Sequence, residues 1–172
     1  MVWTAPTVSG SERALVRQAG LPALLGASLA SLRRPGWQIT CRCTDDQELR
    51  DLSRRFLGED HPTDVLAFAL GDPGRARPAG GQRAVAPMLG DLAISVERAA
   101  AQAEAARVSP VDELRMLAVH GLLHLCGHDH DTPPRAAAMT RATRALLRAD
   151  ACRHGAQAPA VPELVPSPAG PA

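Results

Sequence analysis

Polar and apolar residues alternate along residues 37–44, a pattern that predicts a β-strand with one buried face. Residues 64–70 and 89–96 form two short, almost wholly apolar runs, which are typical of strands covered on both faces. Residues 2–8 are a weaker candidate for a further strand. The pattern therefore predicts one small β-sheet of about four strands.

Helix signals occupy much of the remaining chain. Ser9 followed by Glu12 has the spacing of a capping box, in which each side chain accepts a hydrogen bond from the other residue's backbone N–H. This box opens a helix that we expect to run to Arg34 and to be kinked or divided by Pro22. Capping residues and first-turn prolines further along the chain mark the starts of the later helices. The predicted helices cover residues 9–34, 45–58, 95–108, 109–126 and 132–153.

The order of these elements predicts the fold class. Strands lie early, helices dominate the second half, and no regular strand–helix repeat appears, which indicates an α+β fold with one small mixed β-sheet and helices packed against it. The 172 residues fit one domain that can bury a core. We expect this domain to span residues 1–154, followed by a disordered Pro/Ala-rich tail at 155–172. The sequence assigns no role to the long loop at 71–88.

Composition limits the kinds of partner the chain can bind. The net charge is +1, so no overall field attracts polyanions. Aromatic residues make up only 2% of the chain, namely Trp3, Trp37, Phe56 and Phe68. A surface that stacks bases on many exposed rings is therefore excluded, and any nucleic-acid contact is expected to rely mainly on charge.

Cysteine spacing predicts a reduced, intracellular protein, and hydropathy predicts no membrane span. The four cysteines include no C-x-x-C pair and no disulfide framework, which is typical of a reduced, intracellular chain. The apolar segment 19–32 follows basic residues as a targeting signal would, but Arg33 and Arg34 stand where small cleavage-site residues belong. We expect a helix there. No apolar run is long enough to span a membrane, so no membrane partner is expected.

Histidines are concentrated in residues 120–130, which hold four of the six in the chain. His120 and His124 are four residues apart on a predicted helix, so they share one face. Gly127 can take a left-handed conformation that ends the helix and lets His130 return toward them. The spacing H-x-x-x-H-x-x-G-x-x-H is that of the zinc ligands in metzincins. We predict one zinc ion per chain, held by three neutral nitrogens, with one coordination position open to water.

Two other arrangements of ligands stay open. If the helix continued past Gly127, His128 would take the place of His130, although histidines on three successive turns surround one ion poorly. A structural zinc closed by Cys126 or His128 as fourth ligand would suit a non-catalytic assembly factor. A zinc peptidase is disfavoured, because Gly121 stands where metzincins carry the glutamate that acts as general base.

Three blocks of sequence resemble one known family. The run His120-Gly-Leu-Leu-His-Leu-Cys-Gly-His-Asp-His130 resembles the H-G-x-L-H-L-x-G-Y-D-H signature of the YbeY family, the bacterial endoribonucleases and rRNA maturation factors. Residues 62–68, PTDVLAF, resemble the family's P-T-D-V-L-S-F strand, and residues 89–94, LGDLAI, resemble its L-G-D-I-x-I strand. The blocks follow one another in the family's order.

The resemblance implies a zinc-dependent endoribonuclease specific for single-stranded RNA. It further implies maturation of the small-subunit rRNA, ribosome quality control, and association with the small ribosomal subunit in the cytoplasm, with neither DNA nor a membrane as partner. The zinc ligands of this hydrolase domain would be His120, His124 and His130.

The sequence departs from the family at a position that concerns catalysis. Many members carry Arg at the position of Leu57, where it is the usual candidate for holding the substrate phosphate near the zinc. Arg54, one helical turn earlier on the same face, is a candidate replacement or an ordinary solvated charge. Asp129 is a candidate for orienting an imidazole or a simple helix-end residue. Asp91 and Asp64 are candidates for the cleft from strand ends, although a turn role beside Pro62 is the simpler explanation for Asp64. The general base stays unassigned.

Overall fold

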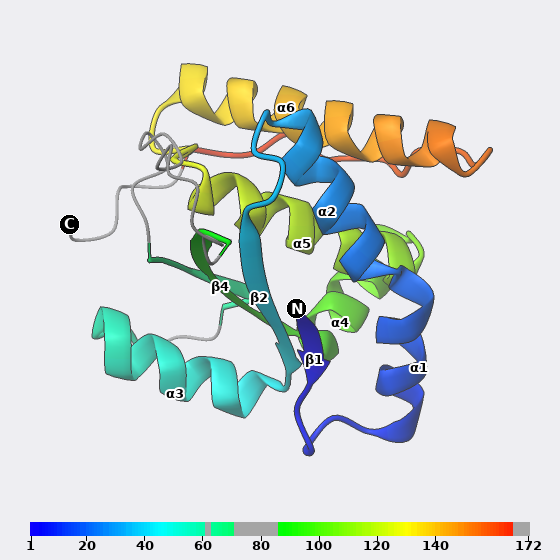
Figure 1. The fold of residues 1–172 in the computed structure, drawn as a ribbon. Coiled ribbons are helices and arrows are strands. Elements are labelled where there is room, and N and C mark those ends of the chain that lie inside the picture. Colours follow the sequence, from blue (N-terminus) through cyan, green and yellow to red (C-terminus); the bar gives the residue numbers. More distant parts are fainter. Residues whose placement is uncertain (61–62, 71–85, 167–172) are drawn as a thin grey trace.

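The computed structural model describes residues 1–60, 63–70 and 86–166 and contains one four-stranded sheet (Figure 1). The strands are β1 (Val2–Thr4), β2 (Gln38–Thr44), β3 (Val65–Ala69) and β4 (Met88–Ser95). Their order is β1-β2-β4-β3, with β1, β2 and β4 parallel and β3 antiparallel to β4. The predicted α+β fold with a small mixed sheet is confirmed.

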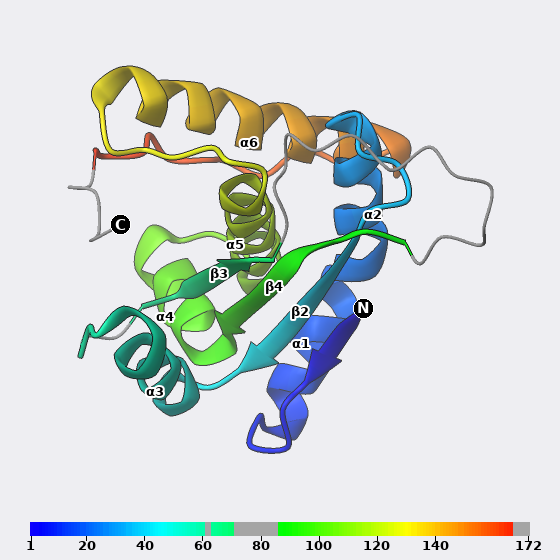
Figure 2. The ribbon, with the colours of Figure 1, turned by 60° about the vertical axis from the view of Figure 1, so that its left-hand side comes forward.

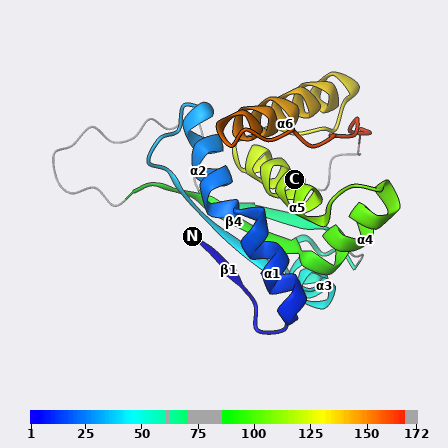
Figure 3. The same ribbon diagram turned by 90° about the vertical axis from the view of Figure 1, so that its right-hand side faces the viewer.

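Helices cover both faces of this sheet. α5 packs against β3 and β4 and also contacts α1, α2, α4 and α6, whereas α3 packs against the same two strands from the other face (Figure 2). Figure 3 shows α6 lying outside α5 and α2. The helices are α1 (Gly10–Ala19), α2 (Leu21–Ser31), α3 (Asp46–Leu57), α4 (Val96–Ala106), α5 (Pro110–Leu125) and α6 (Pro133–Arg153).

The first predicted helix is two helices, because Gly20 breaks it. The Ser9–Glu12 capping box opens α1 as predicted. Gly20 then takes a left-handed conformation with φ 59°, which ends α1, and Pro22 sits in the first turn of α2. We expected Pro22 to divide the helix near this point, and the structure shows that Gly20 divides it.

Side-chain alternation along the strands separates two buried clusters. On the α5 face, Cys41, Cys43 and Ile94 belong to the main core. On the α3 face, Ala93 and Leu66 form a smaller cluster with Leu49 of α3. The cysteines predicted to line the core do so, and all four cysteines of the chain are free thiols. The strand alternation therefore creates two separate environments, one on each side of β4.

The chain beyond α6 packs back on the domain in its described part. Residues 155–166 have no helix or strand, yet Val161 is buried in the main core. The Arg144 guanidinium donates to the Val161 carbonyl oxygen, with Nη2 at 2.7 Å. This packing differs from the disordered tail expected there, and residues 167–172 lie outside the described residues, so the domain boundary stays a prediction. Residues 71–85 of the long loop lie outside them too.

A buried ion pair ties α6 to α5 and α1. Asp150 is 1% exposed and pairs with Arg115 of α5 and with Arg153 of its own helix. Arg115 also donates through Nη1 to the Ala19 carbonyl oxygen at the end of α1, at 2.9 Å. The pair thus holds α5 in a fixed position. In the described chain, no helix has the length and apolar character needed to cross a bilayer.

Candidate metal centre

The end of α5 is built so that the chain turns back after His124. The His128 N–H donates to the Leu123 carbonyl oxygen at 3.0 Å and the Gly127 N–H donates to that of His124 at 2.9 Å. These two bonds are the Schellman motif, which requires a left-handed residue, and Gly127 supplies it with φ 86°. The predicted glycine turn is therefore present, and it carries His128 off the helix.

The turn brings three imidazoles together. One ring nitrogen from each of His120, His124 and His130 lies within 4.8 Å of the others. The centroid of the His130 ring lies 5.3 Å from that of the His120 ring and 5.2 Å from that of the His124 ring. Each of the three residues is partly buried. Spacing alone thus identified the group of side chains that the fold assembles.

Burial favours the neutral form of His120 and His124. Burial, together with the charges that His124 and His130 would carry, lowers the pKa of His120 to about 4. Burial and then His130 lower the pKa of His124 in the same way. Neutral imidazoles offer the lone pairs that a metal ion needs, whereas protonated ones repel it.

The donor set fits a metal ion. The Nε2 atoms of His120 and His124 are 3.2 Å apart. Two nitrogens that each lie about 2.05 Å from a tetrahedral zinc ion are separated by about 3.3 Å. The Nδ1 atom of His130 is buried without a hydrogen-bond partner, an arrangement that a bound cation would satisfy. Within the described part of the chain, neither Cys126 nor His128 joins the group, so the alternatives that used them lack geometric support.

Asp129 fixes the backbone of a ligand candidate rather than an imidazole. Its Oδ1 accepts a hydrogen bond from the His130 N–H at 2.8 Å. Its other carboxylate oxygen lies 3.8 Å from Nη2 of Arg135. Its negative charge also opposes the lowering of the His124 pKa. Asp129 therefore orients the backbone of the segment that returns after the turn, and it does not contact the His130 imidazole through this bond.

Two acidic residues lie near His120: Asp64, which the sequence offered as a candidate for the cleft, and Glu113, which it did not identify. Asp64 lies close enough to His120 to oppose the lowering of its pKa, and it accepts a hydrogen bond from Gln102 at 2.9 Å. Burial and then Asp64 raise the pKa of Glu113. Glu113 precedes His120 by seven residues on α5, and this spacing places them on one helix face. That spacing was a usable signal for Glu113, whereas the contact with Asp64 depends on tertiary packing.

Arg54 and Leu57 lie at the end of α3. Arg54 pairs with Asp60, Nη2 to Oδ1 at 2.7 Å, and with Asp51 at 3.5 Å. Leu57 is 47% exposed in the last turn of α3. Arg54 thus has its charge compensated by two carboxylates, and no contact joins it to the histidines among the residues described.

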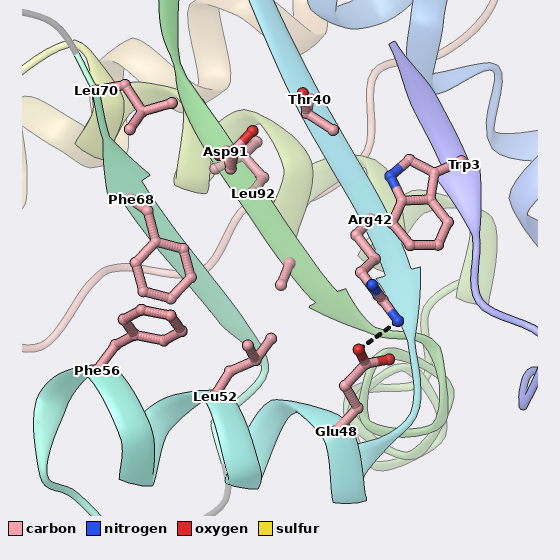
Figure 4. A pocket seen from close by; sticks show the side chains of 11 residues that line it. Trp3, Thr40, Arg42, Glu48, Leu52, Phe56, Phe68, Leu70, Asp91 and Leu92 are labelled. Atoms are coloured by element: carbon pink, nitrogen blue, oxygen red, sulfur yellow. Dashed lines mark ion pairs between the residues drawn. The ribbon is translucent and has the colours of Figure 1, made fainter.

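Asp91 faces away from the histidine helix. Its neighbours in β4, Gly90 and Leu92, point toward α5, because a Cβ at Gly90 would meet Leu125 and Leu92 contacts Gly121. Asp91 itself lines a cavity between α3 and the sheet, which we call the α3 cavity (Figure 4). The expectation that Asp91 belongs to the histidine cleft is therefore not supported by its placement.

Gly121 lies at the contact between α5 and the sheet. A Cβ at this position would come within 2.9 Å of the Leu92 and Val65 side chains. A glutamate here would enter the hydrophobic core instead of reaching a metal ion. The fold thus explains why the residue after His120 is glycine, and it gives a physical reason for the absence of the metzincin base.

The fold and the site define a class of protein. It is an α+β domain in which a helix and its Schellman turn present three histidines able to hold one metal ion. The family model described as Endoribonuclease YbeY matches residues 21–150. The chain belongs to the YbeY family.

Curated relatives agree with this assignment. A protein named Endoribonuclease YbeY from Chloroflexus aurantiacus is 46% identical over 120 residues, which cover 67% of this chain and 74% of the relative. The protein of that name from Chloroflexus aggregans is 41% identical over 135 residues, or 76% and 82% of the two chains. The solution structure of a Thermotoga maritima protein has a TM-score of 0.56 at 20% identity and covers 90% of this chain and 92% of its own, which shows a shared fold.

Proposed function

We propose that the chain is a zinc-dependent endoribonuclease that cleaves single-stranded RNA. We further propose that it matures the small-subunit rRNA, takes part in ribosome quality control and associates with the small ribosomal subunit in the cytoplasm. The observation that carries the proposal is the convergence of one ring nitrogen each from His120, His124 and His130 within 4.8 Å. The shared name of its relatives, Endoribonuclease YbeY, supports RNA as the substrate.

Zinc is the metal that best suits this donor set. Three imidazoles without a thiolate or a bidentate carboxylate match the ligands of catalytic zinc sites, which use three protein ligands. Bound zinc supplies Lewis-acid chemistry, which activates water at neutral pH and polarises a phosphoryl oxygen.

The residues of the chain prepare the site for this chemistry. Burial holds His120 and His124 in the neutral form that binds a cation. The bond from the His130 N–H to Asp129 fixes the returning segment, so that the third imidazole is in place before a metal arrives. The negative charge of Asp64 beside His120 favours a cation further.

Arg54 remains our candidate for contacting the substrate phosphate. The usual family arginine is replaced by Leu57, which has no charge to offer. Arg54 is half exposed, and an incoming phosphate could compete with Asp60 for its guanidinium.

The test compares cleavage of single-stranded RNA and of an unstructured peptide by wild type, His120→Ala and His124→Ala, with and without a chelator. His154→Ala is the matched control, because His154 follows α6 and is not a member of the histidine group. We expect RNA cleavage by wild type and by the control only, and its loss on chelation. Cleavage that survives both site substitutions would identify a contaminant and end the proposal.

A further inference from the structure

The α3 cavity lies on the opposite face of the sheet from α5 (Figure 4). It has a volume of about 560 Å³, which is in the range of small-molecule sites. Although the chain has only four aromatic residues, three of them, Trp3, Phe56 and Phe68, line this one cavity. Four aromatic residues are too few for a broad stacking surface. Because three of them lie at one cavity, this cavity is the place where the chain can stack a flat group.

Residues in register across the strands form the floor and walls of the cavity. Arg42 of β2 is in register with Ala93 of β4. The small side chain of Ala93 leaves space at the centre of the cavity floor. The Arg42 guanidinium carbon lies 4.1 Å from the centre of the Trp3 ring, so Trp3 supports this wall from behind. Phe68 of β3 forms the opposite wall, held edge-on by Phe56 with ring centroids 5.3 Å apart.

The two walls stand diagonally across β4. β2 and β3 flank β4 and are about 9.6 Å apart at the backbone, or two strand spacings, but Arg42 is in register with Leu66, and Phe68 lies two residues further along β3. The Arg42 guanidinium is also ion-paired with Glu48 (Figure 4). A planar group stacked between two others needs about 7 Å between the outer planes, since each contact takes about 3.5 Å. Arginine and aromatic faces are the surfaces on which proteins stack unpaired RNA bases.

Asp91 gives this slot a chemical preference. It stands on the floor, in register with Thr40 on one side and Phe68 on the other. Its carboxylate has no hydrogen-bond or ion-pair partner among residues 1–60, 63–70 and 86–166, and an ionised carboxylate only accepts hydrogen bonds. Guanine presents two adjacent donors, N1–H and the N2 amino group, which match the two carboxylate oxygens. No other RNA base offers such a pair on one edge.

We propose that the α3 cavity binds a guanine base of single-stranded RNA, stacked between Arg42 and Phe68 with its N1–H and N2 amino groups donating to Asp91. The inference rests on RNA being the substrate, as proposed above. Its position supports it, because the edge strand β3 contributes to both sides of the sheet: Val65 packs toward Gly121 on α5, and Phe68 lines the cavity. An RNA strand passing round β3 reaches both.

The experiment measures binding by fluorescence anisotropy of a labelled oligouridine that carries one central guanosine, inosine or adenosine. EDTA is present so that no cleavage occurs. Inosine keeps N1–H but lacks the N2 amino group, so it removes one donor only. We expect wild type to bind the guanosine oligomer about tenfold more tightly than the inosine oligomer, the effect of one charge-assisted hydrogen bond.

Asp91→Asn replaces one acceptor by a donor and is expected to abolish the preference for guanosine. Glu104→Gln removes the same charge from an exposed position on α4 and should leave the preference for guanosine unchanged. Ala93→Leu should fill the slot and weaken binding of all three oligomers; if this variant fails to fold, Asp91→Asn still decides the matter. Equal affinity of wild type for guanosine and inosine, or a preference that survives Asp91→Asn, would overturn the proposal.

The outcomes separate this inference from the proposed function. If RNA is cleaved in a histidine-dependent manner but shows no guanosine preference, only the cavity assignment fails. If the Asp91-dependent preference is found and no cleavage occurs with zinc restored, the base site stands and the nuclease proposal fails.

Discussion

The Nε2 atoms of His120 and His124 lie 3.2 Å apart across one turn of α5, with their rings inclined at 78°. Two nitrogens at this distance, approached by a third from His130, are arranged for a single cation. Protonation of these rings would place like charges in contact, and the lowered pKa of His120 reflects this together with burial. The relationship links the local geometry of a helix to metal binding.

The first prediction concerns Asp129, which bonds the His130 N–H. We expect Asp129→Ala to weaken zinc affinity about tenfold, because His130 loses the contact that fixes its backbone. Asp129→Asn retains a carbonyl acceptor and should restore most of the affinity. Asp131→Ala is the control, since Asp131 pairs with Arg135 and not with a histidine backbone. Competitive titration with a chromophoric chelator measures the affinities, and equal values for wild type and Asp129→Ala would refute the role.

The second prediction concerns packing at Gly121. Gly121→Ala should lower the free energy of unfolding by about 1–3 kcal/mol, since its Cβ would come within 2.9 Å of Leu92 and Val65. Gly26→Ala on α2 is the matched control, because its Cβ would meet nothing within 4 Å. That variant should gain about 0.5–1 kcal/mol from better helix propensity. Urea unfolding of both variants checks the pair, and an undiminished stability of Gly121→Ala would show that α5 can move away from the sheet freely.

The third prediction concerns the buried pair of Arg115 and Asp150. Asp150→Asn should cost about 3 kcal/mol, because it leaves the Arg115 charge poorly compensated in a mostly buried position. Asp51→Asn, which removes a carboxylate from an exposed pair with Arg54, should cost less than about 1 kcal/mol. Chemical denaturation measures both free energies. Similar costs for the two variants would show that the buried position of Asp150 adds nothing.

The fourth prediction concerns acid stability through Asp45. Hydrogen bonds donated by the Thr7 hydroxyl and by the Glu48 N–H hold the pKa of Asp45 below its ordinary value. The unfolded chain therefore binds this proton more readily. The stabilising contribution is complete above the unfolded pKa of about 4 and is lost as the pH falls through the folded pKa.

Asp45→Asn keeps an N-cap oxygen but cannot titrate, so it isolates this effect. The difference in unfolding free energy between wild type and Asp45→Asn should be constant from neutral pH down to about pH 5 and should shrink below about pH 4. Unfolding by urea across this range measures it. A difference that stays the same in acid would exclude the titration of Asp45 as its source.

Local sequence signals predicted the elements and the histidine group well. The spacing of His120 and His124 and the glycine at 127 depend on helix geometry alone, so they could be interpreted without tertiary information. The predicted strands at 37–44 and 89–96 agree within one or two residues with β2 and β4. The fold class followed from the order of these elements.

Features that depend on which face of the sheet a residue occupies could not be predicted in the same way. Asp91 was expected in the histidine cleft, yet strand alternation places it in the α3 cavity. The contact of Asp64 with His120 joins the start of β3 to α5, and no sequence period encodes it. Val161 is buried in the main core, although its Pro/Ala-rich surroundings have the composition of a disordered tail.

Zinc K-edge X-ray absorption of the purified protein tests the central claim most directly. The account predicts one zinc per chain with three imidazole nitrogens at about 2.0 Å, an additional light-atom ligand and no sulfur. A sulfur neighbour at about 2.3 Å would indicate a site closed by a cysteine thiolate, and a protein that binds no zinc would contradict the account altogether.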